Sequence, residues 1–330
     1  MGIIHILAVS IQNRKLSLWL DVQTRKPTMT PKPTILILGA TGRFGQNGVI
    51  AFRKAGWNVR TFDREHDDLM NAANGADVIL NGWNPPYTDW AKQVPELTKR
   101  VIAAAKTTGA TVIVPGNVYV FGTDAPQNFS STTPQTAKNE LGQIRTTMEA
   151  AYRAAGVRTI VLRAGDFLDT HASGNWFDLI MVKKLNKGVF TYPGNPEIPH
   201  AWAYLPDLLR AAVMLAEKRD ALAAFEDVPF PGYTLTGQEL HNAVENAAGH
   251  SVKLRRMNWL PIRLIAPVMP MMKRLVEMSY LWNKPHQLDS HKFNRLLPNF
   301  QATPLDAAIA SAVSFNVDPN KAMVGTHAAV

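Results

Sequence analysis

The sequence of 330 residues contains no cysteine. This absence excludes disulfides, thiol nucleophiles, covalent haem attachment and every cysteine-ligated zinc or iron–sulfur site. It is compatible with a reducing compartment, and we expect a cytoplasmic protein. The chain also lacks the Gly-x-Ser-x-Gly turn of acyl-transfer enzymes and the Walker loop of nucleotide hydrolases. His286 and His291 have no Glu-His zinc pattern beside them, so we expect no metal site.

Uninterrupted apolar runs are scarce as well. The run over residues 3–11 is far shorter than the roughly 20 apolar residues needed to span a bilayer. Residues 257–285 are rich in methionine, but prolines and cations interrupt them, so we expect no spanning helix and no membrane partner. Such a segment is typical of a core or of a pliable pocket wall, and we favour core. Its methionines are Met257, Met269, Met271, Met272 and Met278.

The formal net charge is +9, and nearly half of it lies at the start of the chain. Residues 1–33 contain five basic residues and one acidic residue, a net charge of +4, which leaves +5 for the rest. No dense basic run with interleaved aromatic residues follows, so a solvated surface is favoured over a nucleic-acid footprint. Residues 1–28 lack the pattern of a signal peptide, and we expect a mispredicted or dispensable extension.

From residue 33 onward, strand-like and helical segments alternate. Buried strands are predicted at 34–38, 56–62, 77–80, 111–114 and 158–162, because these runs are apolar and rich in β-branched residues. Helices are predicted between them and after them, at 90–106, 139–155 and 206–219. This alternation indicates an α/β protein with a doubly wound parallel sheet.

The regular alternation ends after residue 163, which suggests a second, smaller part of the structure. We expect a Rossmann domain over residues 34–175, joined by 200–220. A smaller C-terminal substrate lobe is expected over 176–199 and 221–312, followed by a tail at 313–330. Within the lobe, Thr236-Gly-Gln-Glu239 predicts a capping box that begins a helix.

A glycine-rich turn follows the first strand and opens a helix. Gly39 permits a tight turn, Gly42 lets a pyrophosphate approach the backbone, and Gly45 allows the helix to pack against the strand. The unpaired N–H groups and positive end of the helix favour an anion there. We therefore predict a dinucleotide site, with a purely structural turn as the alternative. The same loop contributes Thr41, Arg43 and Phe44 to the predicted site.

The predicted cofactor is NAD(P), with a slight preference for NAD. Asp63 ends the second strand at the distance where a carboxylate accepts from a ribose hydroxyl, and it would repel a 2′-phosphate. Arg43 and Arg64 would favour that phosphate. Asn81 and Gly82 follow strand 77–80, whose end passes under the cofactor in this architecture.

The order of these elements resembles the extended short-chain dehydrogenase/reductase family, of the NAD-dependent epimerase/dehydratase type, over roughly residues 34–312. Residues 113–122 resemble its fifth strand and the Tyr-Gly loop that follows. Leu162-Arg-Ala-Gly-Asp166 is similar to its sixth-strand Arg-Pro-Gly segment, which lies near the nicotinamide. Residues 203–207 and 297–305 are similar to its later His-Val-Asp-Asp and closing segments. In the family's count, strand 77–80 is the fourth.

The catalytic pattern of that family is incomplete. Its Tyr-x-x-x-Lys pair transfers the proton and holds the ribose, but the alignment on Glu149 places Arg145 at the lysine and Leu141 at the tyrosine. The resemblance therefore implies an atypical member. Arg145 would hold a ribose hydroxyl or an anionic substrate, with an exposed helix arginine as the alternative. Asn117 is the nearest replacement for the family's Ser/Thr, and Tyr119 is the best substitute acid.

Candidate substrate residues lie in loops expected at the same edge of the sheet. Trp83, Tyr87 and Trp90 would form an aromatic wall, unless they only fill the domain interface. Asp166 and His200 are polar candidates, with satisfied structural groups as the simpler interpretation.

Two functions follow from these residues. The first is an NAD(P)-dependent oxidoreductase or epimerase/dehydratase-like enzyme that acts on a small carbonyl or hydroxyl compound by hydride transfer. The second is an NAD(P)-sensing regulatory protein of NmrA type without turnover, suggested by the lost Tyr and Lys. The expected partner is a small-molecule substrate rather than nucleic acid, and a homodimer is compatible with the sequence.

Overall fold

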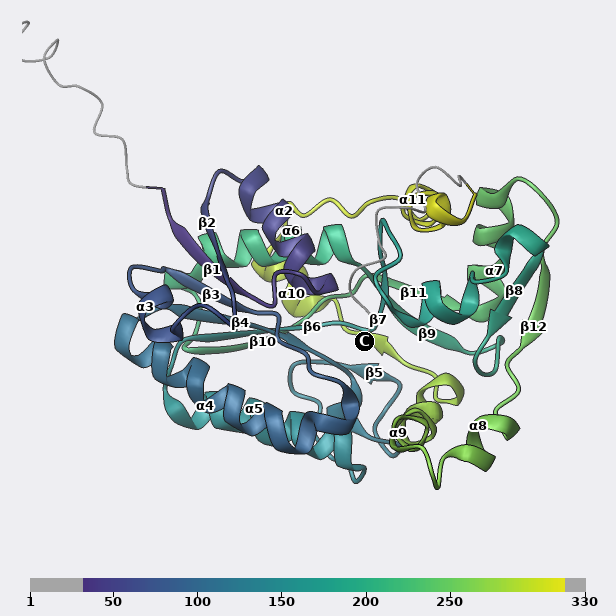
Figure 1. Ribbon diagram of the computed structural model, residues 1–330. Helices are drawn as coiled ribbons and strands as arrows, with labels where there is room; N and C mark the ends of the chain where they lie inside the picture. The colour runs from purple at the N-terminus through teal and green to yellow at the C-terminus, as the bar shows by residue number, and fades with distance from the viewer. Residues whose placement is uncertain (1–31, 318–330) are drawn as a thin grey trace, which may run out of the picture. The chain divides into compact units, whose positions relative to one another are not determined.

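The computed structural model describes residues 32–317, so the predicted extension at 1–28 and the end of the predicted tail lie outside the described residues. A six-stranded parallel sheet forms the centre of the part from Pro33 onward, in the order β2-β1-β3-β4-β6-β10 (Figure 1). The predicted doubly wound parallel sheet is therefore confirmed. Its strands are β1 (Thr34–Leu38), β2 (Asn58–Phe62), β3 (Val78–Asn81), β4 (Thr111–Gly116), β6 (Thr159–Arg163) and β10 (Phe225–Pro229).

The chain reverses its direction of travel across the sheet between β1 and β3. It runs from β1 outward to β2, returns through the short helix α3 (Leu69–Ala73), and continues with β3 on the other side of β1. Strand β3 is thus third in chain order rather than fourth, because α3 leads directly from β2 to β3 within the described residues. In such sheets the ligand lies at the reversal, beyond the carboxyl ends of the strands.

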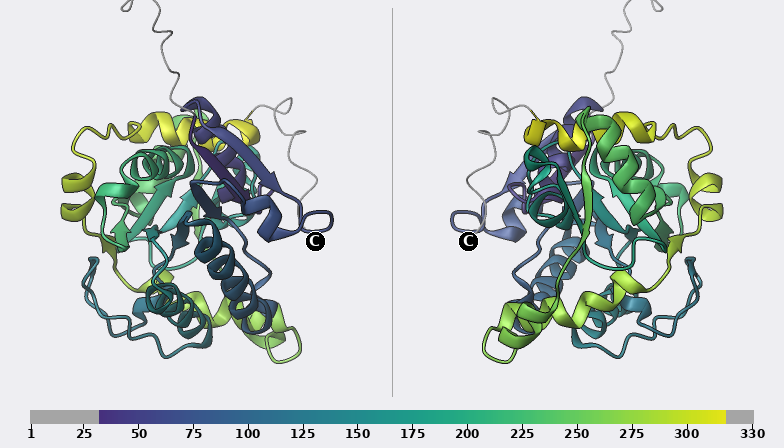
Figure 2. Two further views of the ribbon diagram at one scale, coloured as in Figure 1. Left: turned by 90° about the vertical axis from the view of Figure 1, so that its left-hand side faces the viewer. Right: turned by 90° about the vertical axis from the view of Figure 1, so that its right-hand side faces the viewer.

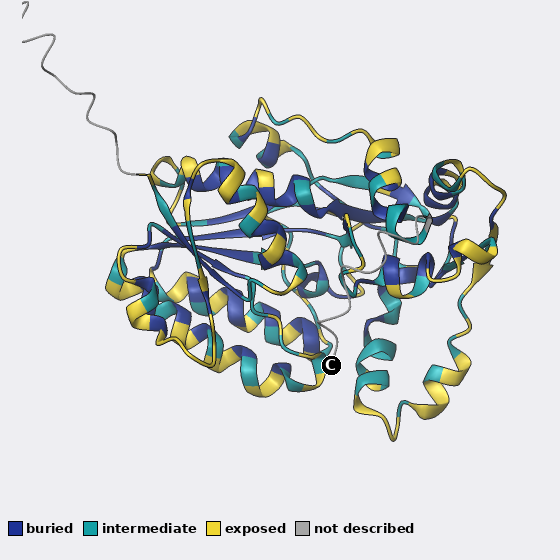
Figure 3. Cartoon of the chain, turned by 45° about the horizontal axis from the view of Figure 1, so that its top comes forward, coloured by how far each residue is buried: buried dark blue, intermediate teal, exposed yellow. Residues whose placement is uncertain are grey.

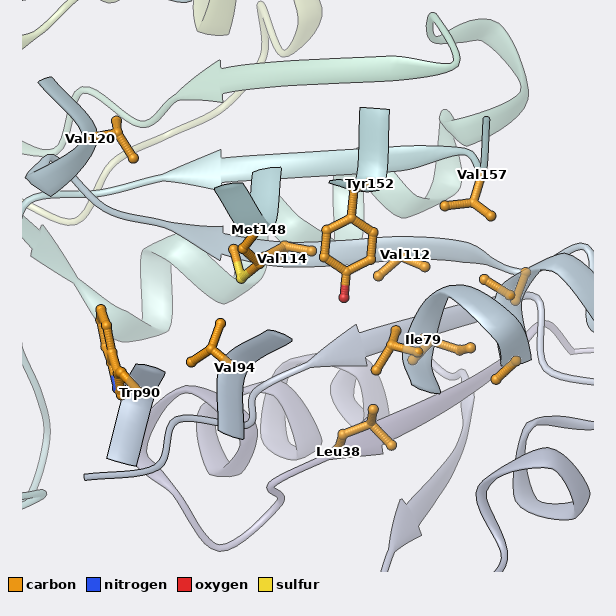
Figure 4. Close-up of a cluster of buried hydrophobic side chains, with 14 of the residues drawn as sticks. Leu38, Ile79, Trp90, Val94, Val112, Val114, Val120, Met148, Tyr152 and Val157 are labelled. Atoms are coloured by element: carbon orange, nitrogen blue, oxygen red, sulfur yellow. The ribbon is translucent and has the colours of Figure 1, made fainter. Parts of the chain in front are cut away.

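Helices cover both faces of the sheet because its inner strands are apolar on both sides. Leu38, Ile79 and Val112 face the helices α4 (Trp90–Thr108) and α5 (Glu140–Ala155), as the close-up of this core shows (Figure 4). Ile35 and Ile37 face the other layer. That layer comprises α2 (Arg43–Lys54), α6 (Leu205–Glu217) and α10 (His291–Leu296). The helices α4 and α5 both end at a glycine with positive φ, as the sequence predicts.

Three smaller sheets extend beyond the carboxyl edge of the central one. The first contains β7 (Asp166–Leu168), β9 (Pro199–Tyr204) and β11 (Tyr233–Thr236); the others pair β8 (Val189–Tyr192) with β12 (Lys253–Arg256) and β5 (Asn128–Phe129) with β13 (Gln287–Leu288). The predicted capping box is present at Thr236 and begins α7 (Gly237–Ala248), which packs against α11 (Leu305–Val317). Strand β10, within the segment assigned to the lobe, completes the central sheet instead.

Short helical turns connect these elements. They are η1 (Tyr87–Asp89), η2 (Tyr119–Phe121), η3 (Phe177–Met181), η4 (Leu185–Lys187), η5 (Arg219–Ala221) and η6 (Ser279–Asn283). The turns η1 and η2 directly follow β3 and β4, so they place their side chains at the carboxyl edge of the sheet.

The methionine-rich segment is mostly not part of the core, so that expectation is wrong. It folds into two short helices, α8 (Leu260–Ile265) and α9 (Pro270–Met278), and from residue 257 to 277 none of its residues is buried. Pro267 and Pro270 prevent the two helices from forming one longer helix, because α8 ends before Pro267 and α9 begins at Pro270. Among the described helices, none has the length and apolarity that crossing a bilayer requires.

Candidate functional site

The glycine-rich turn joins β1 to α2 at the reversal point of the sheet. Gly39 has φ +68°, and a Cβ there would lie 2.8 Å from the carbonyl oxygen of Gly82. A Cβ on Gly45 would lie 2.1 Å from the Gly39 carbonyl oxygen, so these glycines are required by the packing of the turn itself.

Gly42 differs because packing within the protein does not require a glycine at this position. A Cβ on Gly42 would meet only the Gly39 oxygen, at 3.4 Å, an ordinary contact. Gly42 caps the start of α2 without a side-chain hydrogen bond, and the first turn holds no acidic residue. Open space above uncapped N–H groups at a positive helix end fits an anionic pyrophosphate. The exposed Thr41 borders the same space.

Asp63 lies directly after β2, exposed and ionised. Its carboxylate accepts from the Glu65 N–H at 2.9 Å and contacts His66 Nδ1 at 2.9 Å. These two partners lower the pKa of Asp63. Arg64, beside it, is exposed. The carboxylate therefore remains an acceptor for a hydroxyl group over the whole neutral range.

The side chains of Arg43 and Phe44 both contact other parts of the protein. Arg43 Nη2 donates to the carbonyl oxygen of Gly174 at 2.6 Å, which ties the glycine-rich turn to the segment after β7. The Phe44 ring packs in the core between the sheet and α6. Of Phe44, only the backbone can contact a ligand at this turn.

Asn81, the last residue of β3, is buried and its side chain is committed to the protein. Its Nδ2 donates to Tyr152 Oη at 3.1 Å, and burial raises the pKa of Tyr152. Gly82 follows, with its backbone against Gly39. Asn81 therefore supports the turn, and only the backbone beyond it borders the reversal point.

Two phenols from the loops after β3 and β4 meet at the carboxyl edge. Tyr87 Oη lies 2.7 Å from Tyr119 Oη, and the Trp90 ring packs against both rings. Burial raises the pKa of both phenols; the neighbouring Tyr87 and the charge of Asp166 raise that of Tyr119 further. The pair thus stays protonated at neutral pH and acts as an O–H donor rather than as a phenolate.

Asn117 and Arg145 both form hydrogen bonds to the backbone of the segment from Pro115 to Tyr119. Asn117 Oδ1 accepts from the Tyr119 N–H at 3.1 Å. Arg145 Nη2 donates to the Pro115 carbonyl oxygen, and its guanidinium lies 5.5 Å from the Trp90 ring centroid. Burial lowers the pKa of Arg145, and its Nε has no partner within residues 32–317. Arg145 is therefore not an exposed helix arginine.

The next pair joins β7 and β9. His200 Nε2 lies 2.7 Å from Asp166 Oδ2, and the ring of His200 stacks on Trp282 at 4.4 Å and 4°. A quarter of the Asp166 side chain is exposed, whereas His200 is buried. The charge of Asp166 raises the pKa of both phenols. The structure thus brings together Tyr87, Tyr119 and the Asp166–His200 pair, which the sequence placed in separate segments.

Trp83 does not join this group. Its ring packs edge-on against Phe62 at 5.5 Å and lies under Arg100 at 5.6 Å. Of the three residues predicted to form an aromatic wall, Tyr87 and Trp90 pack together, whereas Trp83 lies apart from them. Trp282 was missed, because no motif marks it and only the fold brings η6 to β9.

A buried ion cluster underlies the site and was also missed. Arg163, at the end of β6, contacts Glu149 on α5 with Nη2–Oε2 at 2.7 Å and Asp227 on β10 with Nη2–Oδ2 at 2.6 Å. Its Nη1 donates to the carbonyl oxygen of Asn117 at 2.6 Å. Burial alone would lower the pKa of Arg163, but the two carboxylates outweigh this effect and raise it. Arg163 thus links the sheet, α5 and the Tyr119 loop.

His286, beside His200, is also buried. Its ring lies 4.4 Å from that of His200, Nδ1 contacts the Lys284 carbonyl oxygen at 2.9 Å, and Nε2 has no partner in the described part of the chain. Burial lowers the pKa of His286 to about 3, so the ring is neutral.

Residues 32–317 contain no cluster of three His, Asp or Glu side chains that could hold a metal ion.

Comparisons with known proteins identify the fold. No family model matches the sequence, and no curated protein matches it. Solved structures do: a GalE-like L-threonine dehydrogenase from Cupriavidus necator superposes with a TM-score of 0.68 at 18% identity, over 87% of this chain and 100% of that one.

Two sugar-nucleotide proteins superpose similarly. UDP-glucuronic acid 4-epimerase from Bacillus cereus, in complex with NAD, gives a TM-score of 0.66 at 14% identity, over 86% of this chain and 98% of that one. MoeE5 in complex with UDP-glucose and NAD gives 0.65 at 16% identity, over 85% and 97%. The chain therefore has the fold of the extended short-chain dehydrogenases, as the sequence motifs indicate.

The ion cluster predicts a large effect of Arg163→Met. This change leaves two carboxylates buried without their cation, so we expect the free energy of unfolding to fall by about 3–5 kcal/mol. Urea unfolding followed by circular dichroism measures the change. Lys138→Met, which breaks the exposed pair with Asp124, serves as the control and should leave the midpoint unchanged. Equal midpoints for all three proteins would contradict the assigned role.

The neutral His286 predicts a specific acid sensitivity. An unfolded histidine binds a proton near pH 6.5, whereas folded His286 does so only near pH 3. The stability from the neutral ring is therefore present above pH 6.5 and falls as the pH drops toward 3.

Urea unfolding of the wild type and of His286→Gln at several pH values measures this loss of stability. The difference in stability between them should shrink by up to about 2 kcal/mol between pH 6.5 and 5. His291→Gln, at an exposed histidine, should show no such trend. A difference that does not depend on pH would refute the assignment.

Proposed function

We propose that the protein is an NAD(P)-dependent oxidoreductase or epimerase/dehydratase-like enzyme that acts by hydride transfer on a small carbonyl or hydroxyl compound. The observation that carries this proposal is the shared location of two features at one edge of the sheet: the open, uncapped turn at Gly42 and the Tyr87–Tyr119 pair beside Asp166. Structural neighbours crystallised with NAD support it.

The turn from Gly39 to Gly45 would hold the pyrophosphate of the dinucleotide at the start of α2. Asp63 would accept from a ribose hydroxyl, and its existing contact with His66 keeps it ionised. A carboxylate at this place disfavours a 2′-phosphate, so we propose NAD rather than NADP. Arg145, which the alignment places at the family's lysine, would bind a ribose hydroxyl, the role of that lysine in the family.

When bound, the nicotinamide supplies the hydride chemistry. The chain's own part is to orient the substrate oxygen and to handle its proton. Tyr119 would donate its O–H to that oxygen, with Tyr87 fixing the direction of the phenol. A phenol with a raised pKa cannot act as the base, so Asp166, held by His200, would take up or release the proton.

The aromatic surroundings point to a small, uncharged reacting group. Trp90 packs against both phenols, and Trp282 stacks on His200, so apolar rings border the polar atoms. Sugar nucleotides and 3-hydroxy amino acids are the first compounds to test, because neighbours act on both.

The second candidate is an NAD(P)-sensing protein of NmrA type without turnover. It is favoured by one observation: Leu141, which the sequence alignment places at the family's tyrosine, is fully buried in the core and cannot donate a proton. Under this function the phenols would only pack against the bound cofactor.

A two-variant experiment separates these functions. Titration calorimetry measures NAD binding, and stopped-flow absorbance of the reduced nicotinamide measures turnover on sugar nucleotides, ketones, aldehydes and L-threonine. We expect Gly42→Val to abolish NAD binding, and Tyr119→Phe to keep it while turnover falls about 100-fold. Tyr233→Phe, whose hydroxyl bonds to the Thr303 carbonyl far from these groups in the chain, is the control.

Each outcome decides between the functions. Tight NAD binding without turnover of any compound would favour the sensor. Turnover that is unchanged in Tyr119→Phe would refute the assigned donor. Undiminished NAD binding by Gly42→Val would refute the cofactor site itself.

A further inference from the structure

The helices α8 and α9 and the turn between them, residues 260–278, form a hairpin that exposes apolar side chains. Of the eight large apolar residues exposed among residues 32–317, five lie in this hairpin. Leu264 and Val268 are 71% and 80% exposed. The others are Leu260, Ile265 and Met269. In Figures 1 and 2 the hairpin, coloured green, lies at the edge of the molecule, and Figure 3 shows its exposed tip.

The hairpin is attached to the body at both ends. At its start, Trp259 Nε1 donates to the carbonyl oxygen of Pro193 at 2.5 Å, and the Trp259 ring packs against that of Trp176. Glu277, near the end of α9, accepts from the Leu141 N–H at 2.8 Å, and Arg274 contacts Glu140 with Nη1–Oε2 at 2.6 Å and Nη2–Oε1 at 2.7 Å. Met278 is buried beneath these contacts. The apolar tip therefore projects between two attachments to the body, rather than from a loose loop.

The charged residues of segment 246–276 itself are all basic. From residue 246 to 276 the sequence has no aspartate or glutamate, and it has six lysines and arginines. Arg274 is paired with Glu140 and Glu277, whereas the other five are exposed. They are Lys253, Arg255, Arg256, Arg263 and Lys273. An apolar tip bordered by cations is complementary to a surface with an apolar interior and anionic headgroups.

A second copy of this chain fits this surface poorly. A two-fold contact would bring the same patch against itself and would place the cations of both copies together. We therefore propose that residues 260–278 bind the surface of a membrane that contains anionic lipids, with the apolar tip in the interfacial layer. The sequence-based expectation of no membrane partner concerned a spanning helix, and interfacial binding requires only a short apolar face.

Co-sedimentation of the full chain with lipid vesicles tests this proposal. We expect binding to phosphatidylcholine vesicles that contain phosphatidylglycerol, at least tenfold weaker binding to pure phosphatidylcholine, and weaker binding at high salt. Leu264→Glu with Val268→Glu should reduce binding at least tenfold. Ile50→Glu is the matched control, because Ile50 is an exposed apolar residue on α2, outside the hairpin.

Three results would overturn the proposal. Vesicle binding that the hairpin variant leaves unchanged would assign the binding to another part of the chain. No sedimentation with anionic vesicles at all would exclude the surface. Vesicle binding that is absent while analytical ultracentrifugation shows a dimer, lost in Leu264→Glu with Val268→Glu, would assign the patch to a second copy. Circular dichroism of each variant verifies that it is folded.

Discussion

The arrangement of the whole site depends on one buried guanidinium. Arg163 is fully buried, so its charge requires partners inside the protein, and Glu149 and Asp227 supply them from α5 and β10. The remaining hydrogen bond of Arg163 holds the Asn117 carbonyl oxygen. The side chain of Asn117 in turn fixes the backbone of Tyr119. The electrostatic requirement of one residue thereby determines where the phenol pair lies.

The proposed site would differ from that of the extended short-chain dehydrogenases in how protons are handled. A tyrosine next to a lysine has a lowered pKa, whereas here burial and the charge of Asp166 raise the pKa of Tyr119. Under the proposed function, a protonated donor and a separate carboxylate would divide between them the proton transfer that the family's tyrosine performs. The same carboxylate holds His200, and the stacking of His200 on Trp282 connects this pair to the later segments of the chain.

Much of the fold could be predicted from the sequence because its signals are local. The strands are continuous apolar runs, Gly109 and Gly156 end helices with positive φ, and the capping box at Thr236 depends on a spacing of three residues. The rule that ligands lie at the carboxyl ends of strands predicted that Tyr87 and Tyr119 lie in loops at one edge of the sheet, but their contact was not predicted. The Arg163 cluster had no local signal, because its partners are 14 and 64 residues away. The composition of the methionine-rich segment wrongly predicted a place in the core, because apolar composition does not show whether the rest of the fold packs over a segment.

The most direct test of this account is a crystal structure of the NAD complex. The account predicts that the nicotinamide lies beside the phenol pair, with an open space at its C4 atom bordered by Tyr119 Oη and the Asp166 carboxylate, each within about 3 Å of the oxygen of a bound substrate. A nicotinamide whose C4 face is filled by Trp90 or other side chains, or one placed away from Tyr119, would contradict it.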